Sequence, residues 1–203
     1  MKIICIGRNY VNHAKELGNI ISSEPVFFLK PDTAISPKGH PFFIPDFTSN
    51  VHYEVELIIK INRLGKHIEE GFAHKYYQEI GLGIDFTARD VQEEVKAKGL
   101  PWEKAKGFDG SAVISRSFIP KEELDLNNID FTLEKNGDTV QVGNSKDMLF
   151  NFDKIIAYIS QFYTLKIGDV IYTGTPSGVG QVNNGDILKG FIGTQKMFEV
   201  KVR

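Results

Sequence analysis

Residues 51–61 read VHYEVELIIKI, with apolar side chains at every odd position and with His52, Glu54, Glu56 and Lys60 at even positions. A period of two is typical of a β-strand that buries one face. Because the apolar face is unbroken over six positions, we expect a core strand whose polar face meets a specific partner. The rest of the chain is expected to be organised around this strand.

Two carboxylates, Glu54 and Glu56, share the polar face of this strand. Alternate residues on a strand have Cα atoms roughly 6.5–7 Å apart, so these acids repel each other unless a cation or a proton lies between them. Asp85 follows the short apolar run GLGI at 81–84 and is a third candidate ligand. Carboxylate oxygens suit Mg²⁺ or Mn²⁺, with the remaining positions left to water or substrate.

Two other interpretations of these acids stay open at this point. An acidic pair on a strand can belong to the solvated face of an antiparallel sheet. Asp85 can also be the N-cap of the following helix, although Thr87 could serve as that cap instead.

Composition limits the classes of protein that the chain can belong to. With 203 residues, 41% hydrophobic and 25% charged, it can form one domain around one core. A net charge of −2 without a basic cluster makes nucleic acid an unexpected partner. No apolar run approaches the roughly 18 residues that a membrane span needs. The first apolar run ends after four residues at Gly7, unlike a signal peptide, so a cytoplasmic location is expected.

The single cysteine, Cys5, excludes an intramolecular disulfide framework. It lies inside the first predicted strand, 2–6, and is expected to be a small buried hydrophobe rather than a nucleophile.

A turn and a short helix ended by Gly18 are predicted after this strand. His13 and Glu16 are three residues apart, so they would be neighbours on one helix face. A histidine–carboxylate pair on a short polar element is the arrangement expected of a mobile lid that carries an acid/base group. An exposed polar helix face is the alternative.

The next segments alternate between predicted strands and helices. Residues 25–31 form a short strand ended by a proline, with Lys30 as its only charge, which could also snorkel at the surface. A helical pattern covers 69–79, a strand covers 81–86, and a helix covers 87–99 with Thr87 as its cap.

Arg89 lies in the first turn of that last helix, where a cation is unfavourable to the helix dipole. This position slightly favours pairing with a substrate carboxylate. A salt bridge to Asp90 or Glu93 is the alternative.

Beyond residue 130 the pattern is mainly β. A hairpin at 131–142 turns at Asn-Gly-Asp, 136–138, and a second hairpin joins 186–192 to 197–202. Between them, one amphipathic helix at 151–163 has an expected inner stripe of Phe152, Ile155, Ile156, Ile159 and Phe162. The predicted fold class is therefore mixed, mainly β with few helices.

The segment GTPSGVG at 174–180 is not a phosphate loop, because no Gly-Lys-Ser/Thr follows it. We interpret it as a glycine-rich turn at a strand end that presents the hydroxyl or backbone N–H of Thr175 to a ligand.

Several of these segments, taken in order, resemble the fumarylacetoacetate hydrolase superfamily. The motifs are GRNYVNHAKE at 7–16, PVFFLKPDTA at 25–34, HYEVEL at 52–57, GIDFTARDVQ at 83–92, KGLPWEKAKGFDGSA at 98–112 and YTGTPSGVG at 172–180. The resemblance is to the small acylpyruvase and oxaloacetate decarboxylase branch. It implies a β-roll or distorted β-sandwich, one catalytic domain over 1–203 with a lid at about 8–24, and a homodimer.

The same resemblance implies the roles of individual residues. The metal ligands would be Glu54, Glu56 and Asp85. The catalytic residues would be His13 and Glu16 of the lid, with Lys106 beside the metal. Substrate-binding positions would be Arg8, Lys30, Arg89, Gln92 and Thr175.

The function implied is a Mg²⁺- or Mn²⁺-dependent enzyme on 2-oxo acids. It would hydrolyse acylpyruvates, decarboxylate oxaloacetate through a metal-stabilised pyruvate enolate, or do both. The alternative is an isomerase or decarboxylase of aromatic-degradation products, of the 2-hydroxyhepta-2,4-diene-1,7-dioate or 5-carboxymethyl-2-hydroxymuconate type. A non-catalytic binding module is less expected, because it would not need both the acid cluster and the lid dyad.

Overall fold

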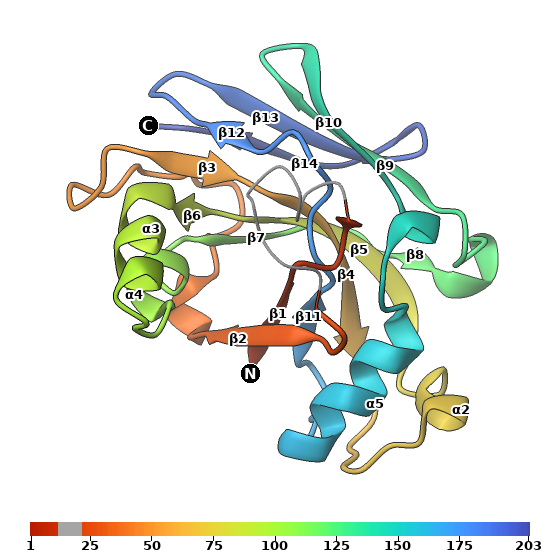
Figure 1. Ribbon diagram of the computed structural model, residues 1–203. Coiled ribbons are helices and arrows are strands. Elements are labelled where there is room, and N and C mark those ends of the chain that lie inside the picture. The colour runs from red at the N-terminus through yellow and green to blue at the C-terminus, as the bar shows by residue number, and fades with distance from the viewer. Residues whose placement is uncertain (12–21) are drawn as a thin grey trace.

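The computed structural model describes residues 1–11 and 22–203, and Figure 1 shows its strands curling around a common interior. The largest sheet has seven strands in the order β2-β1-β11-β4-β5-β7, with β8 paired to β5. Its strands are β1 (Ile3–Gly7), β2 (Val26–Lys30), β4 (Val55–Ile61), β5 (Tyr77–Asp85), β7 (Ala112–Ile114), β8 (Ile119–Pro120) and β11 (Val170–Tyr172). β1 runs parallel to β11, while β4 is antiparallel to both β11 and β5.

A four-stranded sheet in the order β10-β9-β13-β14 faces the large one. Its strands are β9 (Asp130–Lys135), β10 (Asp138–Asn144), β13 (Ile187–Ile192) and β14 (Gln195–Lys201). Both predicted hairpins are confirmed. Asn136 and Gly137 turn the first with φ of 57° and 96°, the positive values that a two-residue hairpin loop requires.

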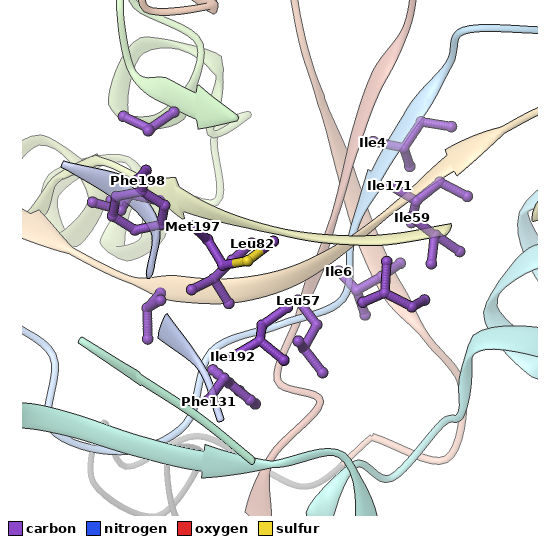
Figure 2. Packing of buried hydrophobic residues seen from close by; sticks show 14 of the residues in the cluster. Ile4, Ile6, Leu57, Ile59, Leu82, Phe131, Ile171, Ile192, Met197 and Phe198 are labelled. Atoms are coloured by element: carbon purple, nitrogen blue, oxygen red, sulfur yellow. The ribbon is translucent and has the colours of Figure 1, made fainter. Parts of the chain in front are cut away.

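The main core fills the space between these two sheets (Figure 2). Leu57 and Ile59 of β4 and Leu82 of β5 project into it, where Phe131 and Phe198 of the smaller sheet lie. On the opposite face of the large sheet, a second apolar cluster contains Ile3, Cys5, Ala34, Ile58, Ala112, Val170 and Tyr172. The expected burial of the cysteine is therefore confirmed.

The α-helices of the described residues are short: α2 (Glu70–Ala73), α3 (Arg89–Ala97), α4 (Glu103–Lys106) and α5 (Phe152–Phe162). Single 3₁₀ turns are η1 (Asp32–Ala34), η2 (Lys121–Glu123) and η3 (Ser145–Asp147). The prediction of a mainly β fold with few helices is confirmed. Within residues 1–11 and 22–203, no helix is both long and apolar enough to cross a membrane.

Helix α5, Phe152–Phe162, confirms the helix predicted over 151–163, with one exception in its inner stripe. Asn151 is its N-cap and accepts a hydrogen bond from the backbone N–H of Lys154 at 2.9 Å. The first four residues of the predicted inner stripe are buried, but Phe162 is 52% exposed. It lies in the last turn and contacts the rings of Phe27 and Tyr158 at the surface.

The helix predicted over 69–79 is wrong beyond its first turn. Only Glu70–Ala73 is α-helical, and Tyr77–Glu79 belongs to β5. Tyr77 pairs with Ile61 of β4 and is 1% exposed. Pairing with a central strand thus overrides the helical spacing of the apolar residues in this segment.

The single strand predicted over 51–61 is divided at Glu54. Residues Val51–Tyr53 form β3 of a small third sheet, ordered β12-β3-β6, whereas β4 belongs to the large sheet. The other strands of the small sheet are β6 (Thr87–Ala88) and β12 (Gly180–Gln181). The segment that pairs with β3 and β4 passes between the same two sheets at Phe86, where β5 ends and β6 begins. Both crossings lie at the same level, and this is where the polar residues gather.

Candidate metal and substrate site

The pairing of β4 with β5 brings the three acids together. Because Val55 lies opposite Ile84 and Glu56 lies opposite Gly83, Asp85 comes level with Glu54, and its backbone N–H donates to the Glu54 carbonyl at 2.9 Å. Glu54, Glu56 and Asp85 each offer a carboxylate oxygen within 4.8 Å of the others, and all three are buried. The interpretation of Glu54 and Glu56 as a solvated strand face is therefore wrong.

The residue opposite Glu56 has to be a glycine. A Cβ at Gly83 would lie 2.4 Å from the carbonyl oxygen of Val113 and 2.7 Å from the ring of Tyr172. The missing side chain lets the Tyr172 ring pack beneath the acids, where its hydroxyl donates to the Val113 carbonyl at 2.6 Å.

Glu56 is buried among the three acids and is 2% exposed. Burial raises its pKa well above the ordinary value, and the charges of Asp85 and Glu54 raise it further. The backbone N–H of Gly174, at the end of β11, donates to its Oε2 at 2.6 Å. A nearby cation would therefore stabilise the ionised form of Glu56.

Lys106 is the cation that touches two of the acids. Its Nζ donates to Glu54 Oε2 and to Asp85 Oδ2, both at 2.8 Å, and to the Thr87 hydroxyl at 2.6 Å. Burial alone would lower the pKa of Lys106, but the charges of Asp85 and Glu54 outweigh burial and raise it. Lys106 is therefore an ammonium ion at neutral pH.

Thr87 consequently has a different role from the predicted helix cap. Helix α3 begins at Arg89 after Ala88, whose side chain makes no capping hydrogen bond. The Thr87 hydroxyl instead fixes the Lys106 ammonium group. The first turn of α3 is held by Asp90, which accepts from the backbone N–H of Val91 at 2.8 Å.

Arg89 pairs with Glu54 of the acid cluster, so the alternative of a salt bridge to Asp90 or Glu93 is wrong. Its Nη2 donates to Glu54 Oε1 at 2.5 Å, and its Nη1 donates to Gln92 Oε1 at 2.6 Å. The guanidinium group is buried at the edge of the site.

Lys30 is 2% exposed, so its interpretation as a snorkelling surface residue is wrong. Its Nζ lies 2.6 Å from Asp85 Oδ1 and donates to the hydroxyl and carbonyl of Ser111 at 2.9 and 3.0 Å. The contact between Lys30 Nζ and Asp85 Oδ1 is an ion pair without a hydrogen bond. Lys30 lies behind Asp85 and is not among the residues that line the cavity.

Sequence reasoning missed Gln141 of β10, which supports the glycine-rich turn. Its side-chain oxygen accepts from the backbone N–H of Val55 at 2.9 Å, directly after the break at Glu54. Its Nε2 donates to the Thr175 hydroxyl at 2.9 Å and to the Pro176 carbonyl at 3.0 Å. No local pattern marks a glutamine in a hairpin as a support for a site more than 80 residues away in sequence.

A cavity opens above the acids. Its lining residues are Ile6, Gly7, Arg8, Phe28, Glu54, Glu56, Asp85, Arg89, Gln92, Lys96, Trp102, Lys106 and Thr175. It thus brings together the predicted metal ligands and most of the predicted substrate-binding positions. His13 and Glu16 lie outside the described residues. Lys96, Phe28 and Trp102 were not among the predicted site residues.

The donor set fits a divalent cation that prefers oxygen. Three buried carboxylates converge, and carboxylate oxygens are ligands that suit Mg²⁺ and Mn²⁺. The acids are balanced by Lys30, Arg89 and Lys106. A bound divalent ion would therefore leave an excess of positive charge that an anionic substrate can neutralise.

Fold and site together define the class of this protein. The family described as fumarylacetoacetate (FAA) hydrolase, C-terminal, matches residues 2–201. The chain belongs to this family, as the sequence resemblance predicts.

Individual relatives narrow the comparison. The mitochondrial oxaloacetate tautomerase FAHD1 of Mus musculus is 45% identical over 202 residues, which cover 98% of this chain and 91% of that protein. The mitochondrial oxaloacetate decarboxylase of Dictyostelium discoideum is 45% identical over 207 residues, covering 100% of this chain and 94% of that protein.

A solved structure shows the same fold. Fumarylpyruvate hydrolase from Pseudomonas aeruginosa, in complex with Mn²⁺ and pyruvate, superposes with a TM-score of 0.92 at 33% identity. The match covers 100% of this chain and 89% of that chain. The expected FAH-type fold is confirmed.

Proposed function

We propose that this chain is a divalent-metal-dependent enzyme that promotes enolate chemistry on a small 2-oxo acid, with oxaloacetate as the first candidate substrate. The observation that carries the proposal is the convergence of three buried carboxylates beside Lys106 and Arg89 in one cavity. The names of the two 45%-identical relatives, an oxaloacetate tautomerase and an oxaloacetate decarboxylase, support the choice of substrate.

The metal would be held by Glu54, Glu56 and Asp85. When bound, Mg²⁺ or Mn²⁺ supplies a Lewis acid that stabilises the negative charge of an enolate. The Mn²⁺ complex of the related hydrolase makes Mn²⁺ a suitable first choice for experiments.

Lys106 and Arg89 provide the fixed positive charge of the site. Lys106 is held by Glu54, Asp85 and Thr87, so its ammonium group is placed to stabilise an oxyanion. Arg89 presents a planar guanidinium group that suits a substrate carboxylate. The side-chain oxygen of Gln92 accepts a hydrogen bond from this guanidinium group and fixes its orientation.

Proton transfer needs a different residue. Keto–enol exchange of oxaloacetate moves a proton at C3, and hydrolysis of an acylpyruvate needs a base that activates water. We assign this role to His13, oriented by Glu16, on the basis of the family resemblance alone. His13→Ala should remove most hydrolysis and less of the decarboxylation, because loss of CO₂ needs no activated water.

Acylpyruvate hydrolysis is the second candidate function. It is favoured by the structural similarity to fumarylpyruvate hydrolase, and both reactions proceed through an enolate beside the same acids. The two candidates therefore differ in whether water attacks the C4 carbonyl.

A substrate panel tests the proposal. Purified protein would be stripped with EDTA, reloaded with Mg²⁺ or Mn²⁺, and supplied with oxaloacetate, acetylpyruvate, fumarylpyruvate or 2-hydroxyhepta-2,4-diene-1,7-dioate. Enol absorbance reports tautomerisation, and pyruvate release reports decarboxylation or hydrolysis. We expect metal-dependent turnover of oxaloacetate. Full activity after exhaustive chelation would contradict the metal requirement, and turnover of the diene dioate alone would favour the isomerase alternative.

Two further parts of the proposal concern the protein as a whole. We propose a homodimer, as in the family, which sedimentation at several protein concentrations would test. We also retain the cytoplasm as the proposed location, although the two named relatives are mitochondrial. Fractionation of cells that express the tagged chain would decide between these compartments.

A further inference from the structure

One face of helix α3 points three polar side chains into the cavity. Arg89, Gln92 and Lys96 are spaced by three and four residues, so they share a face of the helix, and all three line the cavity. Arg89 and Gln92 belong to the acid cluster through their hydrogen bonds. Lys96 lies in the last turn of the helix, about one turn beyond Gln92, and contributes a half-buried cation.

Arg8 is a second cation that lines this cavity outside helix α3. It follows β1 and has a φ of 60°, a backbone conformation that is unfavourable for residues with a Cβ. The conformation is held by the next residue, Asn9, which is 0% exposed. The Asn9 side chain donates to the carbonyls of Phe150 and Thr173 at 3.0 and 2.7 Å and accepts from the Phe150 N–H at 2.8 Å.

Arg8 and Lys96 influence each other electrostatically. Burial lowers the pKa of Lys96, and the positive charges of Arg8 and then Arg89 lower it further, while Glu93 acts in the opposite direction. Like charges in one cavity repel each other, and an anion between them relieves that repulsion.

Apart from Lys106 and Thr175 near the acid cluster, the remaining walls offer little to an anion. Phe28 and Trp102 form an aromatic wall, with ring centroids 5.8 Å apart. The acids among the described lining residues are those of the metal cluster. A second carboxylate of a substrate would therefore find its partners at Arg8 and Lys96.

We infer that Lys96 and Arg8 form a subsite for the distal carboxylate of the substrate, so that the enzyme selects 2-oxo dicarboxylates over 2-oxo monocarboxylates. The inference rests on the proposed function, and it places the C1 carboxylate and C2 carbonyl of the substrate at the acid cluster. The distal carboxylate of oxaloacetate, at C4, then lies toward the last turn of α3. Lys96 and Arg8 would act in binding and orientation, not in proton transfer.

The test compares the keto–enol exchange of oxaloacetate, followed by enol absorbance, with that of its 4-methyl ester, which keeps the 2-oxo acid group but lacks the distal charge and cannot lose CO₂. Lys96→Met should lower kcat/KM for oxaloacetate by about 10- to 100-fold, the usual effect of losing a hydrogen bond to a charged group, chiefly through KM. The ester should be affected less than about threefold, and Lys96→Arg should recover most of the loss.

Lys98→Met is the matched control. It removes the same charge from the C-cap of the same helix, but Lys98 is exposed and pairs with Glu94 outside the cavity. Lys98→Met should leave kcat/KM unchanged for both oxaloacetate and the ester. If Lys96→Met lowers kcat/KM for oxaloacetate and the ester equally, or behaves like Lys98→Met, the subsite is disproved.

Arg8→Gly tests the second residue with little risk to folding, because glycine accepts a φ of 60° without strain. The Tm of this variant should not fall. Its kcat/KM for oxaloacetate should decrease, while its kcat/KM for the ester should stay the same. A loss that is equal for both substrates would overturn the assignment of Arg8.

The subsite and the proposed function can fail separately. If the Mn²⁺-loaded wild type turns over neither compound, the proposed function fails, and calorimetric titration with the same two compounds still tests the subsite. Tighter binding of oxaloacetate that Lys96→Met abolishes would support it. Equal affinities of the wild type for both compounds would overturn it.

Discussion

The two faces of β4 and β5 differ in chemistry although they belong to the same strands. Leu57 and Leu82 project into an apolar core against Phe131 and Phe198. One residue away on β4, Glu56 projects to the opposite side, where the acid cluster lies. Both faces are buried, but the acids on the second face, unlike the apolar residues around them, are not buried for reasons of stability.

Energetic magnitudes explain this contrast. Burying a leucine side chain contributes about 1.5–3 kcal/mol. Burying an ionised carboxylate costs several kcal/mol, which its partners offset only with good geometry. Apolar residues at positions 54, 56 and 85 could pack without that cost, so the acids reflect a function at this face. The predictions below separate the two faces.

The largest effect is expected from Glu56→Gln. The change keeps the size of the side chain and an acceptor for the Gly174 N–H, but it removes one proposed ligand. Mn²⁺-dependent activity should fall by more than about 100-fold, since changes outside the ligand shell already cost 10–100-fold. The Tm should stay the same or rise, because a buried acid has been removed.

Calorimetric titration with Mn²⁺ and activity assays would measure this effect. Glu79→Gln is the control, because Glu79 is a partly exposed acid of β5 that lies near Lys60. Unchanged Mn²⁺ affinity in Glu56→Gln would contradict the metal site.

Leu57→Ala tests the other face of the same strand. Leu57 is 0% exposed, so truncation should lower the free energy of unfolding by about 2–5 kcal/mol. Turnover per folded molecule should change little. Urea denaturation would measure the loss, with Leu64→Ala as the control at a position that is 63% exposed. A fall in turnover without a loss of stability would mean that the two faces are not separable.

Lys30→Met tests whether the ion pair between Lys30 and Asp85 supports the metal site. Removing the ammonium group next to Asp85 Oδ1 should weaken Mn²⁺ binding by about 10- to 100-fold, as for other supports of metal ligands. Lys60→Met is the control for charge, since Lys60 is exposed. Unchanged Mn²⁺ affinity with a raised KM would instead support the substrate-binding role that the sequence predicts.

Asp169→Asn examines a buried acid with a purely structural environment. Its two oxygens accept from the backbone N–H groups of Lys2 and Lys166, both at 2.8 Å. Burial alone would raise the pKa of Asp169, but the hydrogen bonds from Lys2 and Lys166 together lower it. A lowered folded-state pKa stabilises the fold above the unfolded value of about 3.9 and loses this effect as the pH falls below it.

We therefore expect Asp169→Asn to lower the free energy of unfolding by about 1–3 kcal/mol at pH 7. The difference from wild type should shrink as the pH falls below about 4. Urea denaturation across this pH range would measure it. A difference that is independent of pH would show that the charge of Asp169 has no part in the effect. Activity at pH 7 should be unchanged.

Parts of the site follow from local patterns, and others do not. The alternation at 51–61 places Glu54 and Glu56 on one face, because the strand period is fixed by backbone geometry. The break at Glu54 has no sequence signal, since it arises from pairing with two different sheets. The partners of the acids are also non-local. Lys30 is 55 residues from Asp85, and Lys106 is 52 residues from Glu54.

The sequence by itself determined the elements whose signals are local: the Asn136-Gly137 hairpin, helix α5 with its Asn151 cap, and the two faces of the central strand. Only the tertiary structure decided that residues 77–79 form a strand and that Lys30 is buried. It also decided that Lys96 shares a cavity with Arg8. Periodicity and capping are properties of a few neighbouring residues, whereas burial and charge pairing depend on which distant segments the sheets bring together.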